Sequence, residues 1–320
     1  MLDIIIPTKN CVSLLKDCLE SLAIQISPVH VIVVDANSKD GTQDIAKQYG
    51  ADVYIEPPSK VKGSRRAVAC NEGLKHCTHE IVAFVDADTI IPDTWSKSIE
   101  DFFGTDKHIC GETLPRTELN SRAENVAAIT TGCTMNENDF SSVIRFASAH
   151  GRYFEVDTEL ESVPGYNSAY IRECVESVGG FSEDVGGAED FDLCYKLRRK
   201  GYRILGINAP PVEHKERQGM LNFSRQMYGY GWSRGRLYQV RHIFTVIHTL
   251  PLIVMIVTLI LMYIDIRLII MPEVLLLTIF FIVGFLKMTY VYKIIRRIFV
   301  LTIFTLSYGS GYFIGLFEGD

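Results

Sequence analysis

Short apolar segments alternate with helical segments in the first part of the chain, and this alternation limits the possible fold more than any other feature. The segments LDIIIPT, HVIVVDAN, ADVYIEP and EIVAFVDAD are typical of buried strands, and VSLLKDCLESLA, DGTQDIAKQYG and RRAVACNEGLKHC are typical of helices between them. Strands that are apolar throughout and separated by helices predict a parallel sheet with helices on both faces. The predicted fold class is α/β, with a Rossmann-like, mostly parallel sheet.

Polar residues follow the ends of these predicted strands. They are Thr8 and Asn10, Asp35 and Asn37, Glu56, and Asp86 and Asp88. Because the carboxyl ends of parallel strands meet at one edge of the sheet, these side chains are expected to form a ligand site there. No GxGxxG pattern follows the first strand, which disfavours a dehydrogenase.

The acid pair in AFVDADT, Asp86 and Asp88, is the strongest candidate in this set. Divalent cations take oxygen ligands, so two carboxylates on one loop indicate a metal site. The alternative is that the acids cap the helix predicted in PDTWSKSIEDF. Pro92 and Asp93 already supply a start signal for that helix, which favours the metal site.

Several motifs occur in a fixed order over roughly residues 2–240. They are IIIPTKN, VVDANSKDGT, FVDADT, PGYNSAYIREC, VGGFSEDVGGAEDFDLCYKLRRKGYRI and VEH. Together they resemble the family 2 glycosyltransferases of GT-A fold. The resemblance implies an inverting transfer of a sugar from a nucleotide-sugar donor, with Mg²⁺ or Mn²⁺ bridging the diphosphate.

The same resemblance implies contacts to the nucleotide. Asp35 would bind the base edge, with Pro7 and Thr8 beside the base. Asp40, by contrast, is expected to be structural, because together with Gly41 and Thr42 it is typical of the turn and cap of the next helix. Asp86, with Ala87 next to it, would contact the ribose or a metal-bound water, and Asp88 would bind the metal. Many relatives carry an arginine where this chain has Cys70, so Arg65 and Arg66 are expected to reach the diphosphate instead; solvated arginines at a helix start are the alternative.

The pair Glu189–Asp190 opens a predicted amphipathic helix. A one-step inverting transfer needs a base for the acceptor hydroxyl, and the resemblance assigns this role to Asp190, with Glu189 orienting hydroxyl groups. The alternative is that the helix dipole favours acids at this position. His214 is expected to complete the metal shell or contact the diphosphate, although a single histidine is often structural.

The last part of the chain is strongly apolar. Residues 243–264, about 268–286 and 298–317 predict three transmembrane helices, and the basic residues between the last two predict a cytoplasmic loop. The second segment could instead be re-entrant, and the whole region could be a helical subdomain of a soluble protein. Residues 225–242 are basic and aromatic and predict an interfacial segment beside membrane lipids.

These features divide the chain into residues 1–224, 225–242 and 243–320. The first part is the predicted GT-A catalytic domain, with a nucleotide-binding half (1–104) and an acceptor half (105–224). The formal net charge of −6 argues against nucleic acid as a partner. No CxxC pair is present, and reduced thiols are expected.

The expected function is transfer of a sugar from a UDP- or GDP-sugar to a lipid-linked or growing glycan, by a multi-pass membrane protein with a cytoplasmic catalytic domain. A polyprenyl-phosphate sugar synthase is a related alternative, in which the acceptor is already ionised and needs no base. A non-catalytic membrane assembly protein on the same scaffold is an alternative from another class, and a nucleotidyltransferase is a more distant one.

Overall fold

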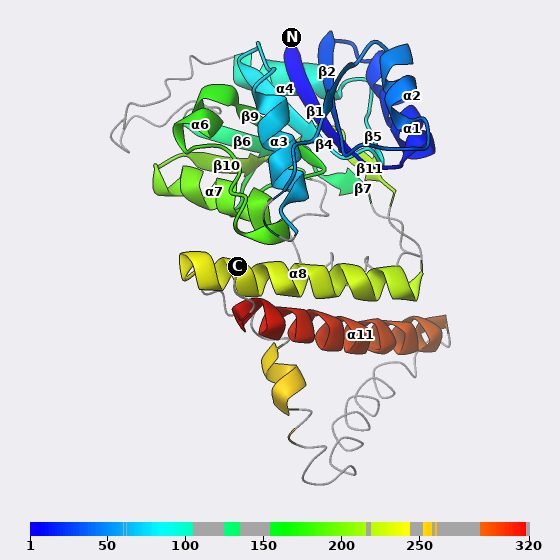
Figure 1. Ribbon diagram of the computed structural model, residues 1–320, viewed down its shortest axis with the longest axis vertical. Coiled ribbons are helices and arrows are strands. Elements are labelled where there is room, and N and C mark those ends of the chain that lie inside the picture. Colours follow the sequence, from blue (N-terminus) through cyan, green and yellow to red (C-terminus); the bar gives the residue numbers. More distant parts are fainter. Residues whose placement is uncertain are drawn as a thin grey trace. The chain divides into compact units, whose positions relative to one another are not determined.

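The computed structural model forms two compact units (Figure 1). The first comprises Met1–Glu137 and Ser148–Glu216, and the second comprises Asn138–Ala147 and Arg217–Asp320. The structure describes residues 1–59, 61, 63–104, 125–134, 154–215, 219–243, 252–257, 260 and 289–317.

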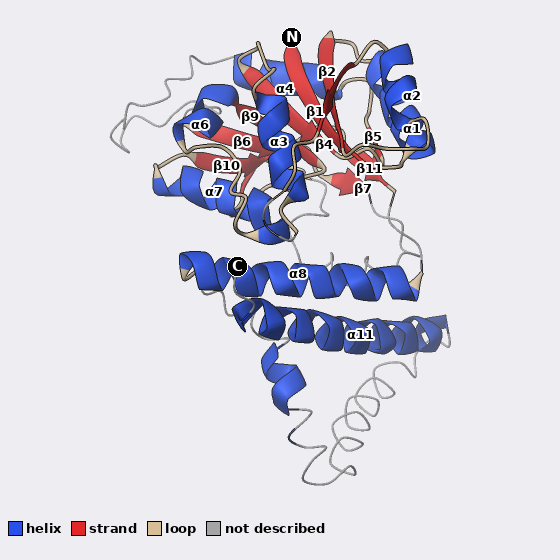
Figure 2. Ribbon diagram, in the orientation of Figure 1, coloured by secondary structure: helices blue, strands red, loops and turns tan. Residues whose placement is uncertain are grey.

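The first unit contains all the described strands and most of the helices (Figure 2). The strands are β1 (Leu2–Thr8), β2 (Val29–Asp35), β3 (Asp52–Ile55), β4 (Ile81–Val85), β5 (Thr89–Ile90), β6 (Val126–Thr130), β7 (Cys133–Thr134), β8 (Thr158–Glu159), β9 (Asn167–Ile171), β10 (Arg203–Gly206) and β11 (Val212–His214). The helices are α1 (Val12–Ala23), α2 (Thr42–Gln48), α3 (Arg65–Leu74), α4 (Trp95–Gly104), α6 (Arg172–Ser177), the 3₁₀ turn η2 (Gly186–Ala188) and α7 (Glu189–Arg199).

Eight strands form the central sheet in the order β3-β2-β1-β4-β9-β6-β10-β8. Neighbours are parallel from β3 to β4 and again between β6 and β10, whereas β9 is antiparallel to both β4 and β6. The predicted α/β fold with a mostly parallel sheet is therefore confirmed. The register of β1 and β2 runs from Leu2 opposite Val29 to Thr8 opposite Asp35, so the polar strand ends lie at one edge.

The apolar strands form the core because side chains on both faces are covered. Ile4, Ile5 and Ile6 are all fully buried, which explains why the sequence of β1 shows no polar alternation. Helix α3 packs closely on β1: a Cβ atom on Gly73 would lie 2.6 Å from Ile5 Cγ2. This close packing brings the first turn of α3 to the sheet edge where the strands end.

The second unit is built around α8 (Met220–Arg241) and α11 (Thr289–Phe317). Gly231 of α8 meets the backbone of Tyr308, and Gly315 of α11 meets the backbone of Trp232. The contacts run in the same order along both helices, so the helices are parallel. Phe223, Met227, Leu252, Tyr308 and Tyr312 form a small apolar cluster beside these glycines.

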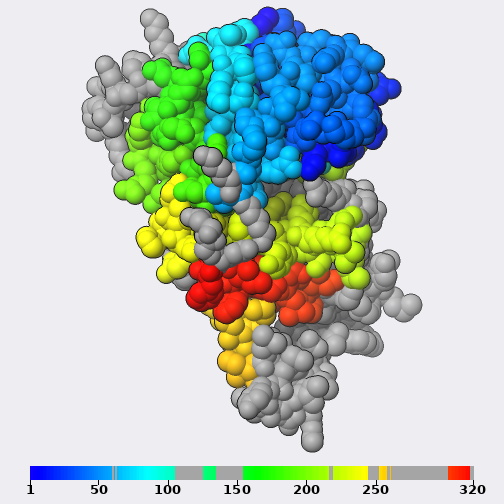
Figure 3. All heavy atoms as spheres, viewed as in Figure 1, coloured from blue at the N-terminus to red at the C-terminus, as the bar shows by residue number. Residues whose placement is uncertain are grey.

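Large apolar side chains of this second unit also reach the surface. In Figure 3, α11 and the short helical segment 252–257 both present atoms to solvent. The exposed side chains are Ile253, Val254, Ile256 and Val257 in the segment, and Leu306, Phe313, Ile314 and Phe317 in α11.

The prediction of transmembrane helices is not supported. None of the helices that the structure describes is long and apolar enough to cross a membrane. The first predicted span (243–264) lies mostly, and the second (268–286) wholly, outside the described residues. The third (298–317) is the later part of α11, a helix that begins at Thr289 and so includes Lys293, Arg296 and Arg297, three of the four basic residues expected in a loop.

Two smaller expectations also need correction. Trp232, which belongs to the segment predicted to lie beside membrane lipids, is 6% exposed, whereas Tyr230 in the same helix is 48% exposed. The buried free thiols include Cys18, Cys70, Cys77 and Cys194. Cys174 is disulfide-bonded, so the prediction that all the cysteines are reduced was wrong.

Candidate functional site

Asp35 organises the loop that follows β2. Its Oδ1 accepts hydrogen bonds from Thr8 Oγ1 (3.1 Å) and Ser38 Oγ (2.5 Å), and its Oδ2 accepts from the Ser38 N–H (2.8 Å) and Gln43 Nε2 (2.7 Å). Asp35 is fully buried, and Pro7 precedes Thr8 within the same strand. In this conformation the carboxylate holds the loop together, and its contact with a base stays a prediction.

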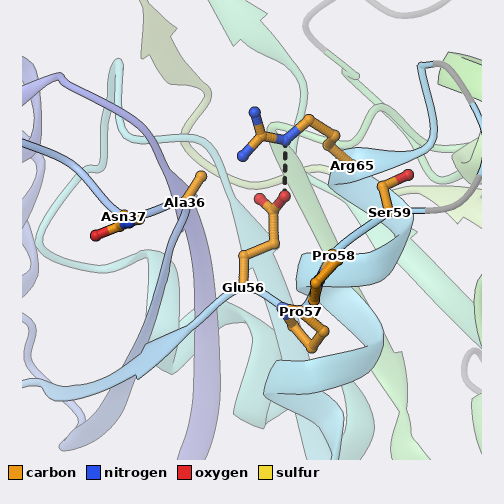
Figure 4. Close-up of a pocket in the computed structure, with 7 residues that line it drawn as sticks. All are labelled: Ala36, Asn37, Glu56, Pro57, Pro58, Ser59 and Arg65. Carbon is orange, nitrogen blue, oxygen red and sulfur yellow. Dashed lines mark hydrogen bonds and ion pairs between the residues drawn. The ribbon is translucent and has the colours of Figure 1, made fainter.

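A pocket of about 320 Å³ opens beside this loop, at the ends of β2 and β3 (Figure 4). Arg65 Nε donates to Glu56 Oε1 across it at 2.7 Å. The side chain of Glu56 is 7% exposed and that of Arg65 is 47% exposed, so Arg65 lies at the rim. The lining residues are Ala36, Asn37, Glu56, Pro57, Pro58, Ser59 and Arg65.

The predicted metal residues come together at the end of β4. Asp86 and Asp88 follow this strand, and β11 pairs antiparallel with β5, placing His214 opposite Thr89. The Lys215 N–H donates to the Asp88 carbonyl oxygen at 2.9 Å, which fixes the pairing. His214 Nε2 lies 3.1 Å from Asp88 Oδ1, and one ligand atom each from Asp86, Asp88 and His214 lies within 4.8 Å of the others.

The chemistry of this cluster fits a divalent cation. Asp88 Oδ1 is buried and accepts no well-formed hydrogen bond from the described residues; its neighbour is His214 Nε2, and a cation bound between these two atoms would serve as a partner for both. Two carboxylates and an imidazole suit Mn²⁺, which accepts nitrogen ligands more readily than Mg²⁺ does. Ala87, between the two acids, is nearly buried.

Tyr166 orients the histidine of this cluster. Its ring stacks on the His214 ring, with centroids 4.3 Å apart and planes 20° from parallel. Thr89 Oγ1 donates to the Tyr166 carbonyl oxygen at 3.4 Å, which ties the 164–167 loop to β5. Nothing in the spacing of the sequence shows that Tyr166 reaches a residue of β11.

Arg66 joins the metal cluster to α7. Its Nε and Nη2 both donate to Asp86 Oδ1 at 3.2 Å, Nη1 donates to Glu189 Oε1 at 3.1 Å, and Nη2 donates to the Gly165 carbonyl oxygen at 2.6 Å. A Cβ atom on Gly165 would lie 2.7 Å from Arg66 Cζ, so any other residue there would displace the guanidinium group from this position. The two adjacent arginines therefore occupy different positions: Arg65 lies at the rim of the pocket, and Arg66 lies between Asp86 and Glu189.

Glu189 has the most perturbed carboxyl group of the site. It is 3% exposed, and burial raises its pKa from 4.5 to about 7, with Arg66 lowering it and the charge of Asp190 raising it. Its Oε2 is buried and has no hydrogen-bond partner among the described residues. A substantial fraction of Glu189 is therefore protonated near neutral pH.

Asp190 follows Glu189 in the first turn of α7 and is half-buried. Its Oδ1 accepts a hydrogen bond from the Phe191 N–H at 2.6 Å. Burial works to lower the pKa of Arg66, but the acidic groups around it, including Asp86, Glu189 and Asp190, raise that pKa above its usual range. The acids from β4 and α7 thus converge on one guanidinium group.

Two family models match the chain: "Glycosyl transferase family 2" over residues 3–156 and "Glycosyl transferase family group 2" over residues 81–311. A pre-mycofactocin glycosyltransferase of Mycobacterium tuberculosis is 27% identical over 250 residues, covering 75% of this chain and 47% of the relative. The O-antigen chain rhamnosyltransferase RfbN of Salmonella typhimurium is 27% identical, covering 66% and 65%. The chain thus spans about half the length of the first of these relatives.

Among solved structures, the chain is similar to the mannosyltransferase PcManGT of Pyrobaculum calidifontis, in complex with GDP-mannose and Mn²⁺. The TM-score is 0.62 at 20% identity, and the match covers 96% of this chain and 86% of that protein. At this identity the likeness supports the fold.

Proposed function

Because the chain belongs to the family 2 glycosyltransferases, we propose that it moves a sugar from a UDP- or GDP-sugar to a lipid-linked or growing glycan. The observation that carries this proposal is the convergence of Asp86, Asp88 and His214 with Arg66 and Glu189 beside the pocket at the strand ends. Such a site has a place for a nucleoside, a cation for its diphosphate and acids for the transfer.

The donor would lie along the edge of the sheet. The pocket at the ends of β2 and β3 would take the nucleoside base, and Pro7, Thr8 and Asp35 lie at the adjoining ends of β1 and β2. Asp86 and Ala87 would face the ribose. Arg66 already donates to three groups, so the exposed Arg65 is the better candidate for the diphosphate.

Asp88 and His214 would hold the divalent cation. When bound, the cation stabilises the negative charge that develops on the departing nucleoside diphosphate. Mn²⁺ in the similar Pyrobaculum structure and the mixed carboxylate–imidazole set both support this cofactor.

Asp190 would remove the proton from the acceptor hydroxyl as its oxygen attacks the anomeric carbon. The bond between that carbon and the diphosphate oxygen breaks in the same step, which inverts the configuration. Arg66 would keep Glu189 and Asp86 in place, and Glu189, which is protonated to a substantial extent near neutral pH, would orient a sugar hydroxyl.

An acceptor carried on a lipid fits the surface of the second unit. The exposed apolar side chains of segment 252–257 and of α11 would rest on a membrane surface, which would raise the effective concentration of such an acceptor. The Salmonella relative acts on O-antigen chains, which agrees with a growing glycan.

The test is transfer by the purified full-length protein with a panel of UDP- and GDP-sugars, polyprenyl-linked acceptors, and Mn²⁺, Mg²⁺ or EDTA. We expect turnover with one nucleotide class, and loss of it in EDTA. Asp190→Asn should abolish transfer to a hydroxyl; if activity survives while Asp88→Ala is inactive, the acceptor is an ionised phosphate. If no nucleotide sugar binds with any metal, the proposal fails.

A further inference from the structure

A cluster of two histidines and two aspartates lies away from the candidate active site, at the opposite edge of the central sheet. Asp3, His30 and Asp52 lie at or near the starts of β1, β2 and β3. His79 lies two residues before the start of β4. The strand register pairs Asp3 with His30 at one end and Thr8 with Asp35 at the other. The cluster is therefore separated from the nucleotide edge by the length of the strands.

Asp3 is the centre of this cluster. Its Oδ1 lies 2.6 Å from His30 Nδ1 and 2.9 Å from His79 Nδ1. Its Oδ2 accepts hydrogen bonds from the N–H groups of Thr78 and His79, each at 2.7 Å. The carboxylate is thus held rigidly by the backbone through one oxygen, and its other oxygen faces two imidazole nitrogens.

The outer contacts of His30 resemble those of a metal ligand. His30 Nε2 lies 3.0 Å from Asp52 Oδ2, on the side of the ring opposite Asp3. A ligating histidine commonly donates its second N–H to a carboxylate, which fixes the tautomer and the ring orientation. Asp52 is therefore placed to keep the proton on Nε2 and leave Nδ1 free for a metal.

We propose that Asp3, His30 and His79 form a second metal site, which takes a borderline transition ion such as Zn²⁺ and is distinct from the site at Asp88. One ligand atom from each of the three residues lies within 4.8 Å of the others, and Asp3 Oδ1 is the oxygen nearest to both Nδ1 atoms. The site has three protein ligands and leaves one tetrahedral position for water.

The geometry needs only a small change to accept the ion. Bonds of about 2.0 Å in a tetrahedral zinc site keep the ligand atoms roughly 3.3 Å apart. The two nitrogen–oxygen distances of 2.6 and 2.9 Å would open by less than an ångström, and each Nδ1 proton would pass to solvent as the ion binds. Asp3 is fully buried, but both imidazoles are 30% exposed, so the ion can reach the site.

The types of ligand atom also determine which metal ion the site would prefer. Imidazole nitrogens suit Zn²⁺ and similar ions, whereas Mg²⁺ prefers an all-oxygen shell. Such a site would pin the starts of β1 and β2 to the segment that leads into β4. Its expected effect is on stability, because none of its residues lies at the nucleotide edge.

The test is zinc binding to the metal-stripped full-length protein, measured by calorimetry and by thermal unfolding. Since Asp86, Asp88 and His214 can also bind Zn²⁺, the measurement is made in a His214→Ala background as well as in the parent protein. We expect about one equivalent of Zn²⁺ to remain in that background and to raise the unfolding temperature. His30→Ala/His79→Ala should remove this equivalent and the temperature shift.

His76→Ala is the matched control. His76 is 28% exposed, contacts Glu72 on the surface of α3, and should leave zinc binding unchanged. X-ray absorption of the zinc-loaded His214→Ala protein supplies a readout that does not depend on the folding of the double variant, and should show two nitrogen ligands. The proposal is overturned if zinc binding is lost in His214→Ala, if it persists in a folded His214→Ala/His30→Ala/His79→Ala protein, or if the bound ion has only oxygen ligands.

Discussion

Replacing Arg66 with methionine should destabilise the first unit, and the loss should grow as the pH rises. Arg66 is the group that holds Asp86, Glu189 and the Gly165 carbonyl together. Methionine keeps part of the side-chain volume and removes all the donors. Glu189, already 3% exposed and lacking a partner at Oε2, would then be buried without any cation beside it.

The magnitude follows from the burial of Glu189. Removing one partner of a buried ion pair costs about 3–5 kcal/mol. Arg66 and Asp86 are 22% and 34% exposed, so solvent screening reduces the share of Asp86. We therefore expect a loss of about 2–3 kcal/mol in the free energy of unfolding at high pH, most of it from Glu189.

The pH dependence has a definite sign. The folded pKa of Glu189 is raised from 4.5 to about 7, so its contribution to stability is fully present below 4.5 and is lost as the pH rises through 7. Without Arg66 the folded pKa rises further, and the additional loss appears above pH 7. At about pH 5.5 Glu189 is mostly protonated in both folded proteins, and the loss should fall to about 1 kcal/mol or less.

Urea unfolding at about pH 5.5 and about pH 8.5 measures this difference. The chain has two tryptophans, and in a Trp232→Phe background the fluorescence reports Trp95 of the first unit. Trp95 is fully buried and donates to Asn167 Oδ1 at 3.0 Å, so its signal follows the core. Lys97→Met is the control, because Lys97 and its partner Asp101 are both more than half exposed.

An equal loss at both pH values would refute the reasoning, because it would show that Arg66 does not act on the charge of Glu189. A second variant checks this independently. In Arg66→Met/Glu189→Gln the buried charge is absent, so most of the loss at high pH should be recovered. A double variant as unstable at high pH as Arg66→Met would point instead to packing around Gly165.

Three further predictions concern the metal, the helix pair and the pH profile. Asp88→Ala should weaken Mn²⁺-dependent nucleotide binding at least about tenfold, measured by calorimetry, and retained metal dependence would exclude Asp88 as a ligand. Gly231→Ala should lower the unfolding temperature, because the added Cβ would meet the Tyr308 carbonyl oxygen. Gly229 has open space around it, so Gly229→Ala should leave the unfolding temperature unchanged. Equal effects of the two substitutions would contradict the close packing of α8 and α11. Transfer activity should change with an apparent pKa of about 7, and Glu189→Gln should remove that change; a profile that is the same in both proteins would assign it to another group.

The grouping of polar residues at the ends of the strands was predictable from the sequence. Asp86 and Asp88 follow an apolar strand, and parallel strands bring their ends to one edge whatever the loops do. The same argument applied to strand starts would have grouped Asp3, His30 and Asp52. That argument could not have predicted the orientation of the His30 and His79 imidazole rings, because the position of His79 depends on the loop before β4.

Contacts between distant elements were not predictable. The sequence indicated Arg66 as a ligand of the diphosphate, but in the structure it bridges Asp86 and Glu189, which lies 123 positions along the chain. Asp35 accepts hydrogen bonds from Thr8, Ser38 and Gln43, which the sequence did not indicate, and its contact with a base stays a prediction. Local spacing carries no information on which donor will satisfy a buried carboxylate.

The sequence by itself determined the α/β class and the edge of the sheet at which the polar strand ends gather, because apolar periodicity and strand ends are local properties. Tertiary structure decided how the acids are paired, that Tyr166 stacks on His214, and that α11 begins early enough to include basic residues and packs on α8 through glycines. The physical reason is that each of these contacts joins segments far apart in the chain. Which segments meet depends on how the whole sheet and helix pair close.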